Sequence, residues 1–141
     1  MKIEIKKLDE NARMPNYAHP QDAGMDLFAV ESCTIAPLSR AVVATGIAMK
    51  IPLGYVGLVW DKSGLAVKKG LTMLAGVIDS GYRGEIKIVV QNLESESFEV
   101  IKGNKIAQML IQPVLQPELI SVDSLDETSR SEGGFGSTGE K

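Results

Sequence analysis

The apolar residues of this chain recur at every second position, in short runs that are separated by turn sequences. In the run "EIKIVVQNL", Ile86, Ile88 and Val90 share one face of an extended strand, and "YVGLVWD" alternates in the same way. Further runs of this kind are "KIEIKKL", "MDLFAV", "RAVVATGI", "AMKIPL", "SFEVI" and "KIAQMLIQPVL". The pattern predicts an all-β fold, a jelly-roll-like barrel or sandwich. Only "SGLAVKKG" predicts a short helix, with Ser63 as its cap and Gly70 as its stop.

The length of 141 residues is that of a single domain. From about Glu127 onward the large aliphatic residues stop, and serine, threonine, glycine and charged residues take over. We therefore expect a packed domain over residues 1–126 and a flexible C-terminal arm over residues 127–141.

Charge and composition narrow the classes of partner. A net charge of -3 and a pI near 5.2 argue against binding to nucleic acid or to an anionic membrane, either of which needs clustered lysine and arginine. No apolar run approaches the roughly 18 residues of a membrane span, and the first ten residues lack the apolar core of a signal peptide, so we expect a cytoplasmic protein. A single cysteine, Cys33, and a single histidine, His19, exclude an internal disulfide and a Cys/His zinc cluster. A metal would be a hard cation held through oxygen atoms.

The tail "GGFGSTGEK" has the GxGxxG spacing of a phosphate-binding loop. Such a loop normally requires a strand before it and a helix after it, and only two residues follow the last glycine here. The spacing alone is therefore also compatible with a frayed end of the chain. Arg130 and Phe135 add a phosphate-binding guanidinium group and an aromatic ring to this tail.

The densest polar cluster lies in "AGVIDSGYRGE", residues 75–85. Ser80 and Gly81 predict a hairpin turn, so that Asp79 and Tyr82 flank it and face one cavity of about the width of a nucleoside. A plain hairpin with a solvated aspartate is the alternative. If the cavity binds a ligand, the carboxylate of Asp79 could accept a proton from water.

Three other segments carry candidate binding residues. In "DKSGLAVKKG", Lys62, the Ser63 hydroxyl and the amides near Gly64 could hold phosphate at the start of a helical turn. In "AGMDLFA", Asp26 lies between apolar residues and needs a partner; it could cap a loop or hold a magnesium ion through water. In "GNKIAQML", Gln108 is a polar strand position.

The order and spacing of "AGMDLFA", "KSGLAVKKGL", "AGVIDSGYRGE", "GNKIAQMLI" and "RSEGGFGSTG" resemble the five motifs of the trimeric dUTP diphosphatase family, from about residue 22 to residue 139. The resemblance implies hydrolysis of dUTP to dUMP and pyrophosphate, with Mg2+ as cofactor and with active sites shared among the subunits of a homotrimer. An isolated subunit would then be inactive. The tail would need no helix, because it would fold over nucleotide bound at other subunits.

The resemblance also implies a role for each candidate. Asp79 would be the general base that activates water, Tyr82 would exclude a 2'-hydroxyl group, and Asp26 would orient Mg2+ through a water molecule. The remaining implied substrate-binding residues are Gly76, Val77 and Ile78 at the uracil edge, Lys62, Ser63, Gly64 and Gln108 at the phosphates, and Arg130, Phe135, Gly136 and Ser137 in the arm, with Phe135 stacked on uracil and Arg130 on the terminal phosphate.

Three departures from the family pattern stand out. The second motif usually begins Pro-Arg-Ser, and this chain has Asp61-Lys62-Ser63. Lysine supplies a point charge without the bidentate fork of arginine, and Asp61 is expected to point away from the phosphates, because neighbours on a strand face opposite sides. Gly81 stands where many members have an acid, and Met73 stands where some have a base-reading asparagine.

Two alternatives remain at this point. A dCTP deaminase shares the fold, but it would need an arginine and a glutamate where this chain has Val67 and Val89. A nucleotide-binding regulator without turnover could dispense with Asp79, which is present.

Overall fold

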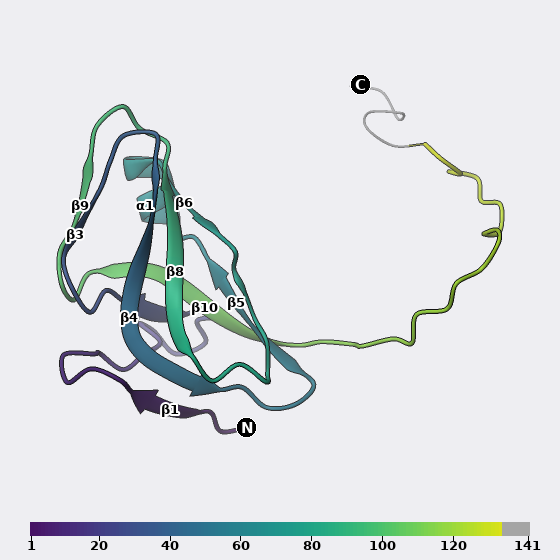
Figure 1. Ribbon diagram of the computed structural model, residues 1–141, viewed down its shortest axis with the longest axis horizontal. Helices are drawn as coiled ribbons and strands as arrows, with labels where there is room; N and C mark the ends of the chain where they lie inside the picture. The colour runs from purple at the N-terminus through teal and green to yellow at the C-terminus, as the bar shows by residue number, and fades with distance from the viewer. Residues whose placement is uncertain (134–141) are drawn as a thin grey trace.

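The computed structural model describes residues 1–133, and within them it contains ten strands and one short helix (Figure 1). The strands are β1 (Glu4–Lys7), β2 (Met25–Phe28), β3 (Cys33–Ile35), β4 (Arg40–Lys50), β5 (Tyr55–Trp60), β6 (Leu71–Leu74), β7 (Val77–Ile78), β8 (Glu85–Asn92), β9 (Phe98–Val100) and β10 (Lys105–Pro113), and the helix is α1 (Ser63–Lys69). The predicted all-β class with one short helix is confirmed.

The strands form two open four-stranded sheets and one two-stranded sheet. Their orders are β1-β4-β8-β6, β2-β10-β5-β7 and β3-β9, and the neighbouring strands pair antiparallel. Neither of the larger sheets closes into a barrel, so a sandwich is the form that the described residues take.

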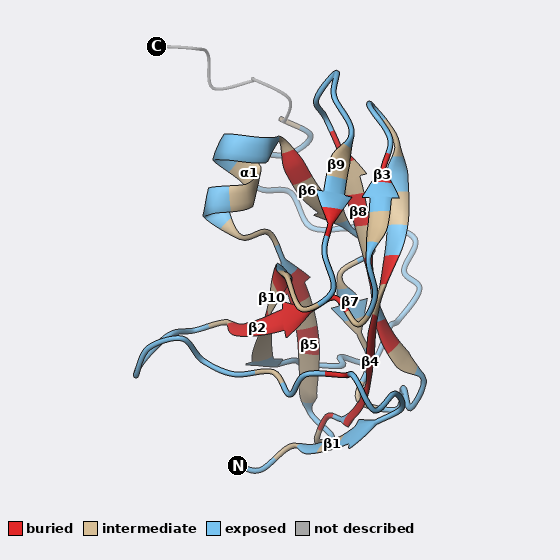
Figure 2. Cartoon of the chain, turned by 90° about the vertical axis from the view of Figure 1, so that its left-hand side faces the viewer, coloured by how far each residue is buried: buried red, intermediate tan, exposed pale blue. Residues whose placement is uncertain are grey.

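One hydrophobic core lies between the two larger sheets, as the burial colours of Figure 2 show. The alternation predicted for β8 is confirmed, because Ile86, Ile88 and Val90 are all fully buried while Lys87 is exposed. The other large side chains with almost no exposure are Leu27, Ile35, Val43, Ile47, Ile51, Leu71, Val100, Ile106 and Met109. Residues from β2 and β10 of one sheet thus pack against residues from β4 and β8 of the other.

The helix differs from the prediction at its start and agrees with it at its end. Its N-cap is Lys62, which has extended dihedral angles and makes no side-chain cap hydrogen bond, so the prediction of Ser63 as the cap is wrong. The carbonyl group of Lys62 instead accepts hydrogen bonds from the N–H groups of Leu65 and Ala66. Gly70 ends the helix in the left-handed conformation, with φ of 56°, and donates its N–H to the carbonyl of Ala66.

The segment around Ser80 and Gly81 forms a turn, closed by a 3.1 Å hydrogen bond from the N–H of Tyr82 to the carbonyl of Asp79. The prediction of a hairpin is nevertheless wrong. The strand before the turn, β7, pairs with β5, whereas the strand after it, β8, pairs with β4 and β6 in the other sheet. The turn is therefore a crossing between the two sheets.

Residues 114–133 contain no strand and run away from the sheets (Figure 1). Their large apolar side chains are exposed, and these are Val114, Leu115, Leu119, Ile120, Val122 and Leu125. Over residues 1–133, no helix has the length and apolar character needed to cross a lipid bilayer.

Candidate active site

The turn at residues 79–82 opens onto a cavity of about 190 Å3. Asp79 and Tyr82 both line this cavity, together with Val77, Ile78, Glu85 and Lys87. The hydroxyl group of Tyr82 donates a hydrogen bond of 3.0 Å to the carbonyl of Glu85, which orients the ring beside the cavity. The carboxylate of Asp79 is exposed, so water can reach it.

The segment that precedes Asp79 is held close to β5. The N–H of Val59 donates a 2.8 Å hydrogen bond to the carbonyl of Gly76, and Val77 and Ile78 continue the pairing opposite Leu58 and Gly57. A Cβ atom on Gly76 would lie 2.5 Å from the carbonyl oxygen of Val59, which is backbone and cannot turn away. Glycine at position 76 is therefore required by this close approach.

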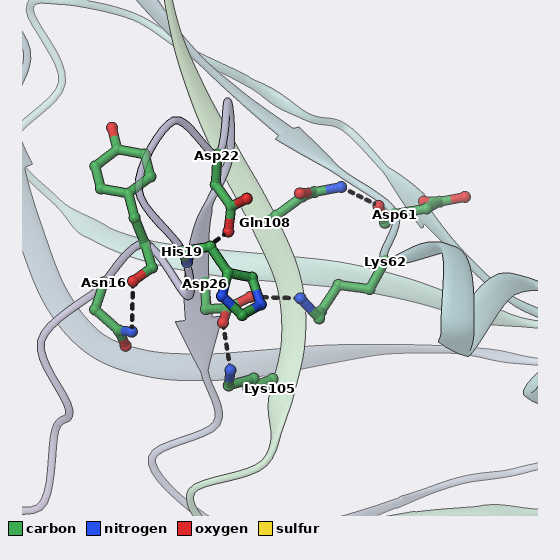
Figure 3. A network of polar contacts seen from close by, with 9 residues as sticks. Asn16, His19, Asp22, Asp26, Asp61, Lys62, Lys105 and Gln108 are labelled. Atoms are coloured by element: carbon green, nitrogen blue, oxygen red, sulfur yellow. Dashed lines mark hydrogen bonds and ion pairs between the residues drawn. The ribbon is translucent and has the colours of Figure 1, made fainter.

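A second polar cluster surrounds Asp26 on β2 (Figure 3). Asp26 is only 3% exposed, and its carboxylate forms ion pairs with Lys62 and, at 2.6 Å, with Lys105. Burial alone would raise the pKa of Asp26, but the two ammonium groups outweigh it and hold the pKa below its ordinary value. Asp26 is thus a buried anion with two cationic partners.

Gln108 joins this cluster because of strand register. On β10 it lies opposite Asp26 of β2 on one side and opposite Trp60 of β5 on the other. Its side-chain amide donates a 2.8 Å hydrogen bond to the carbonyl of Asp61. A Cβ atom on Gly24 would lie 2.5 Å from Oε1 of Gln108, so the glycine leaves room for this side chain.

The side chains of Asp61 and Lys62 point to different partners. Lys62 reaches Asp26, whereas the carboxylate of Asp61 accepts hydrogen bonds from the hydroxyl of Thr72 and the N–H of Met73. The two side chains thus point apart as expected, although both residues follow the end of β5 and lie outside the strand from which the expectation was argued. The ammonium group of Lys62, however, is engaged by Asp26 in this structure.

The remaining sequence-predicted residues are spread over the chain. Ser63 and Gly64 are exposed in the first turn of α1, where helical N–H groups have no intrahelical partner. Arg130 is exposed, and its Nε donates a 2.8 Å hydrogen bond to the carbonyl of Gly133. The three arm candidates Phe135, Gly136 and Ser137 lie outside the described residues.

Lys105 and the pair Glu85 and Lys87 were not predicted from the sequence. In a regular strand, Lys105 and Gln108 would face opposite sides, because they are three positions apart. A register shift between Lys105 and Ala107 breaks the alternation and brings Lys105 to the same carboxylate that Lys62 contacts. No signal in the sequence marks this irregularity. Glu85 and Lys87 are two positions apart on β8 and therefore share one face of the strand. Both line the cavity beside Tyr82, and the period-two pattern of the sequence could have predicted that they lie together.

The donor set around Asp26 bears on the expected metal. Within residues 1–133 there is no group of three or more His, Cys, Asp or Glu side chains that could hold an ion. Asp26 offers one carboxylate, whose oxygens already face lysines. Mg2+ commonly retains several waters and binds through one or two carboxylates together with substrate phosphates. The described residues thus supply a single carboxylate that faces two lysines, and it could serve only an ion that a phosphate ligand brings with it, after Lys62 has left Asp26.

Comparisons with known proteins give a consistent result. The family model described as dUTPase matches residues 10–139. Among curated relatives, the deoxyuridine 5'-triphosphate nucleotidohydrolases of Clostridium kluyveri and Clostridium novyi are 48% and 49% identical, and each match covers 99% of both chains.

Among solved structures, the dUTPase of Staphylococcus bacteriophage 80alpha with dUPNHPP is 34% identical, with a TM-score of 0.91 over 98% of each chain. A mutant dUTPase from phage phi11 of S. aureus, in which the coordination of a structural Mg(II) ion is described, is 33% identical. Its TM-score is 0.82, over 88% of this chain and 98% of that one.

Proposed function

Because this chain belongs to the dUTPase family and hydrolyses dUTP to dUMP and pyrophosphate, we propose that Asp79 is the base that activates the attacking water. The observation that carries the proposal is the placement of Asp79 and Tyr82 on one turn that lines one cavity. The deaminase alternative loses support, because the relatives are named for dUTP hydrolysis and positions 67 and 89 hold valines.

In the proposed reaction, the oxygen of a water molecule forms a bond to the α-phosphorus of dUTP. The bond from that phosphorus to the bridging oxygen breaks, and pyrophosphate leaves with the electron pair. Asp79 accepts the proton that the water loses. The exposure of its carboxylate supports this role, because the base must meet solvent before the nucleotide closes the site.

The cavity walls support recognition of the nucleoside. The backbone groups of Gly76, Val77 and Ile78 would bind the uracil edge, and the close approach of this segment to β5 supports a fixed position for these groups. The ring of Tyr82 would pack on deoxyribose and exclude a ribose 2'-hydroxyl. Its hydrogen bond to the carbonyl of Glu85 supports a fixed ring position.

The cluster around Asp26 supports phosphate binding. Lys62, Ser63 and Gly64 are consecutive and Gln108 comes from the adjoining strand β10, and Lys62 supplies the positive charge. To reach phosphate, Lys62 must leave Asp26, and Lys105 then remains as the partner of that carboxylate. The exchange replaces one anionic partner of Lys62 by another, so the ammonium group is never left unpaired.

Mg2+ is the proposed cofactor. Bound to the triphosphate, it would act as a Lewis acid that offsets negative charge. Asp26 would orient it through water once Lys62 has moved to the phosphates. The description of a structural Mg(II) ion in the phi11 dUTPase lends general support, although it concerns that protein.

A homotrimer with shared active sites is the proposed assembly. None of the residues that line the cavity at Asp79 belongs to the cluster of Asp26, Lys62 and Gln108, so one chain presents two separate half-sites. The apolar residues of 114–125 are exposed in a single chain, and contact with a second copy would bury them. The arm would then close over nucleotide bound at other subunits, with Arg130 on the terminal phosphate, Phe135 on uracil, and Gly136 and Ser137 beside them.

The test is pyrophosphate release from dUTP, dCTP, dTTP and UTP with Mg2+, by the wild type, Asp79→Asn and the control Glu31→Gln. Glu31 is an exposed carboxylate outside both half-sites. We expect turnover of dUTP alone, lost in Asp79→Asn and kept in the control, with binding of dUpNHpp retained in all three proteins. Full activity of Asp79→Asn would refute the role of Asp79, and release of ammonia from dCTP would restore the deaminase alternative.

A further inference from the structure

Asp61 lies at a junction of the fold, between the end of β5 and the start of α1. Its side chain is half-buried and bonds to β6, eleven and twelve positions further along the chain. Oδ1 accepts a 2.6 Å hydrogen bond from the N–H of Met73, and Oδ2 accepts a 2.9 Å hydrogen bond from the hydroxyl of Thr72. Charge-assisted bonds of this kind are the stronger ones in proteins.

The bond to Met73 has a particular role at this position. β6 is the last strand of the order β1-β4-β8-β6, so its outward N–H groups have no strand to pair with. Asp61 supplies the missing acceptor for Met73. Within residues 1–133, no lysine or arginine forms an ion pair with Asp61. The carboxylate is therefore held by the hydroxyl of Thr72 and the N–H of Met73.

The main chain around Asp61 belongs to the phosphate cluster. Its carbonyl oxygen accepts the 2.8 Å hydrogen bond from Gln108, and the next residue, Lys62, forms the ion pair with Asp26. One residue thus bonds to the phosphate cluster through its carbonyl and to β6 through its carboxylate.

β6 leads directly into the proposed base-reading segment at residues 76–78. Only Ala75, with φ of 49°, and Gly76 separate the end of β6 from β7. The segment is held at Gly76 by Val59 and, before it, at Met73 by Asp61. Only two residues lie between these two bonds, so a displacement of Met73 would reach Gly76 over a short span of chain.

We propose that Asp61 is a positioning residue that fixes the base-reading segment relative to the phosphate cluster and thereby contributes to selection of the uracil base. It acts through Met73 and Gly76 and does not itself contact the nucleotide. This inference rests on the proposed function, because it assumes that residues 76–78 read the base.

The experiment compares Asp61→Ala and Asp61→Asn with the control Glu99→Ala. In the Asp61→Asn variant the side-chain oxygen can still accept from Met73, and the amide can donate to the oxygen of Thr72, so both bonds survive without the charge. Glu99→Ala also removes a carboxylate that accepts a threonine hydroxyl, at 2.9 Å from Thr34, but in the β3–β9 sheet. Thermal unfolding shows whether each variant is folded.

We measure kcat and KM for dUTP, dCTP and dTTP, and hydrogen exchange of the Met73 amide. For Asp61→Ala we expect a rise in KM for dUTP of about tenfold, the size of one lost charge-assisted hydrogen bond, with a much smaller change in kcat. We also expect weaker discrimination against dCTP and dTTP, and exchange at Met73 that is faster by about tenfold or more. Glu99→Ala should resemble the wild type in all of these quantities, and Asp61→Asn, which keeps both bonds without the charge, should lie closer to the wild type than to Asp61→Ala.

The inference is overturned if Asp61→Ala keeps the KM and the selectivity of the control, or if Asp61→Asn is as impaired as Asp61→Ala. Failure of the proposed function is recognised separately. A wild type that does not turn over dUTP refutes that function, whereas unchanged exchange at Met73 in Asp61→Ala refutes the contact on which the positioning role depends.

Discussion

Asp26→Asn tests the cluster that the structure builds around one buried carboxylate. The substitution keeps the size of the side chain but removes the charge that faces Lys62 and Lys105. One lysine would then meet the amide NH2 group, which donates and cannot accept. We expect a less stable protein at neutral pH.

The size of the expected loss in stability depends on how far the two lysine side chains are exposed to water. A hydrogen bond to a charged group contributes about 1.5–3 kcal/mol, and the side chains of Lys62 and Lys105 are 28% and 46% exposed, so water partly solvates them when they are unpaired. We therefore take the lower end for the contact that is lost and a smaller amount for the contact that keeps an uncharged acceptor, which gives about 2 kcal/mol. For a domain of this size, 1 kcal/mol lowers Tm by about 3–5 °C, so the expected decrease is about 8 °C.

The effect has a defined pH dependence. The two lysines hold the pKa of Asp26 below its ordinary value of 3.8, against the opposing effect of burial, so the folded state binds this proton less tightly than the unfolded state does. The contribution is therefore complete above pH 3.8 and is lost as the pH falls through the lower folded pKa. The difference in free energy of unfolding between wild type and Asp26→Asn should be constant near neutral pH and shrink in acid.

The assay is thermal and urea unfolding of both proteins between about pH 3 and pH 7, at one protein concentration because assembly affects Tm. The control is Glu4→Gln, which removes the exposed ion pair between Glu4 and Lys50 and should leave Tm unchanged. Equal stability of Asp26→Asn and wild type at neutral pH would refute the reasoning. A difference that persists undiminished in acid would show that it does not arise from the charge of Asp26.

Three further changes have expected outcomes. Gly76→Ala should weaken binding of dUpNHpp, measured by calorimetry, because its Cβ would lie 2.5 Å from the carbonyl of Val59. Asn92→Ala should lower the free energy of unfolding by about 3 kcal/mol, measured in urea, because the two N–H groups of the fully buried Asn92 side chain are shared among three backbone carbonyls and its Oδ1 accepts one N–H. Deletion of residues 127–141 should leave the circular dichroism spectrum unchanged but lower kcat/KM for dUTP by about two orders of magnitude, as the proposed arm no longer orients the substrate.

The strands were predictable where one face is buried along a sufficient length. β8 alternates over eight residues, and each apolar position of the predicted face is buried. The partner of each strand was not predictable. The turn at Ser80 and Gly81 has the chemistry of a hairpin, yet the turn residues carry no information on whether the next strand pairs with the previous one or crosses to the other sheet. With only two residues, β7 is too short to show a period of its own.

The candidate residues were identified in the sequence by motif order, but most of their contacts were not. The pairing of Lys62 with Asp26 joins positions 36 residues apart and depends on the register of β2, β10 and β5. Lys105 was not predicted as part of the cluster, because its place beside Asp26 results from a register shift. Regular alternation along the strand would put Lys105 on the face opposite to Gln108. A period-two pattern fixes faces within a strand and leaves such long-range pairs undetermined.

The departures from the family pattern at positions 61 and 73 are separate facts in the sequence and a single contact in the structure. Asp61 replaces the usual proline and Met73 the asparagine of some members, and the carboxylate of the first accepts the N–H of the second at 2.6 Å. A proline at position 61 has no side-chain acceptor to offer that N–H, so the aspartate provides a bond that the usual residue cannot form. Residues in direct contact do not contribute independently to stability or binding. The effect of Asp61 on the site therefore has to be measured together with that of Met73. In the same way, the effect of Lys62 has to be measured together with that of its partner Asp26.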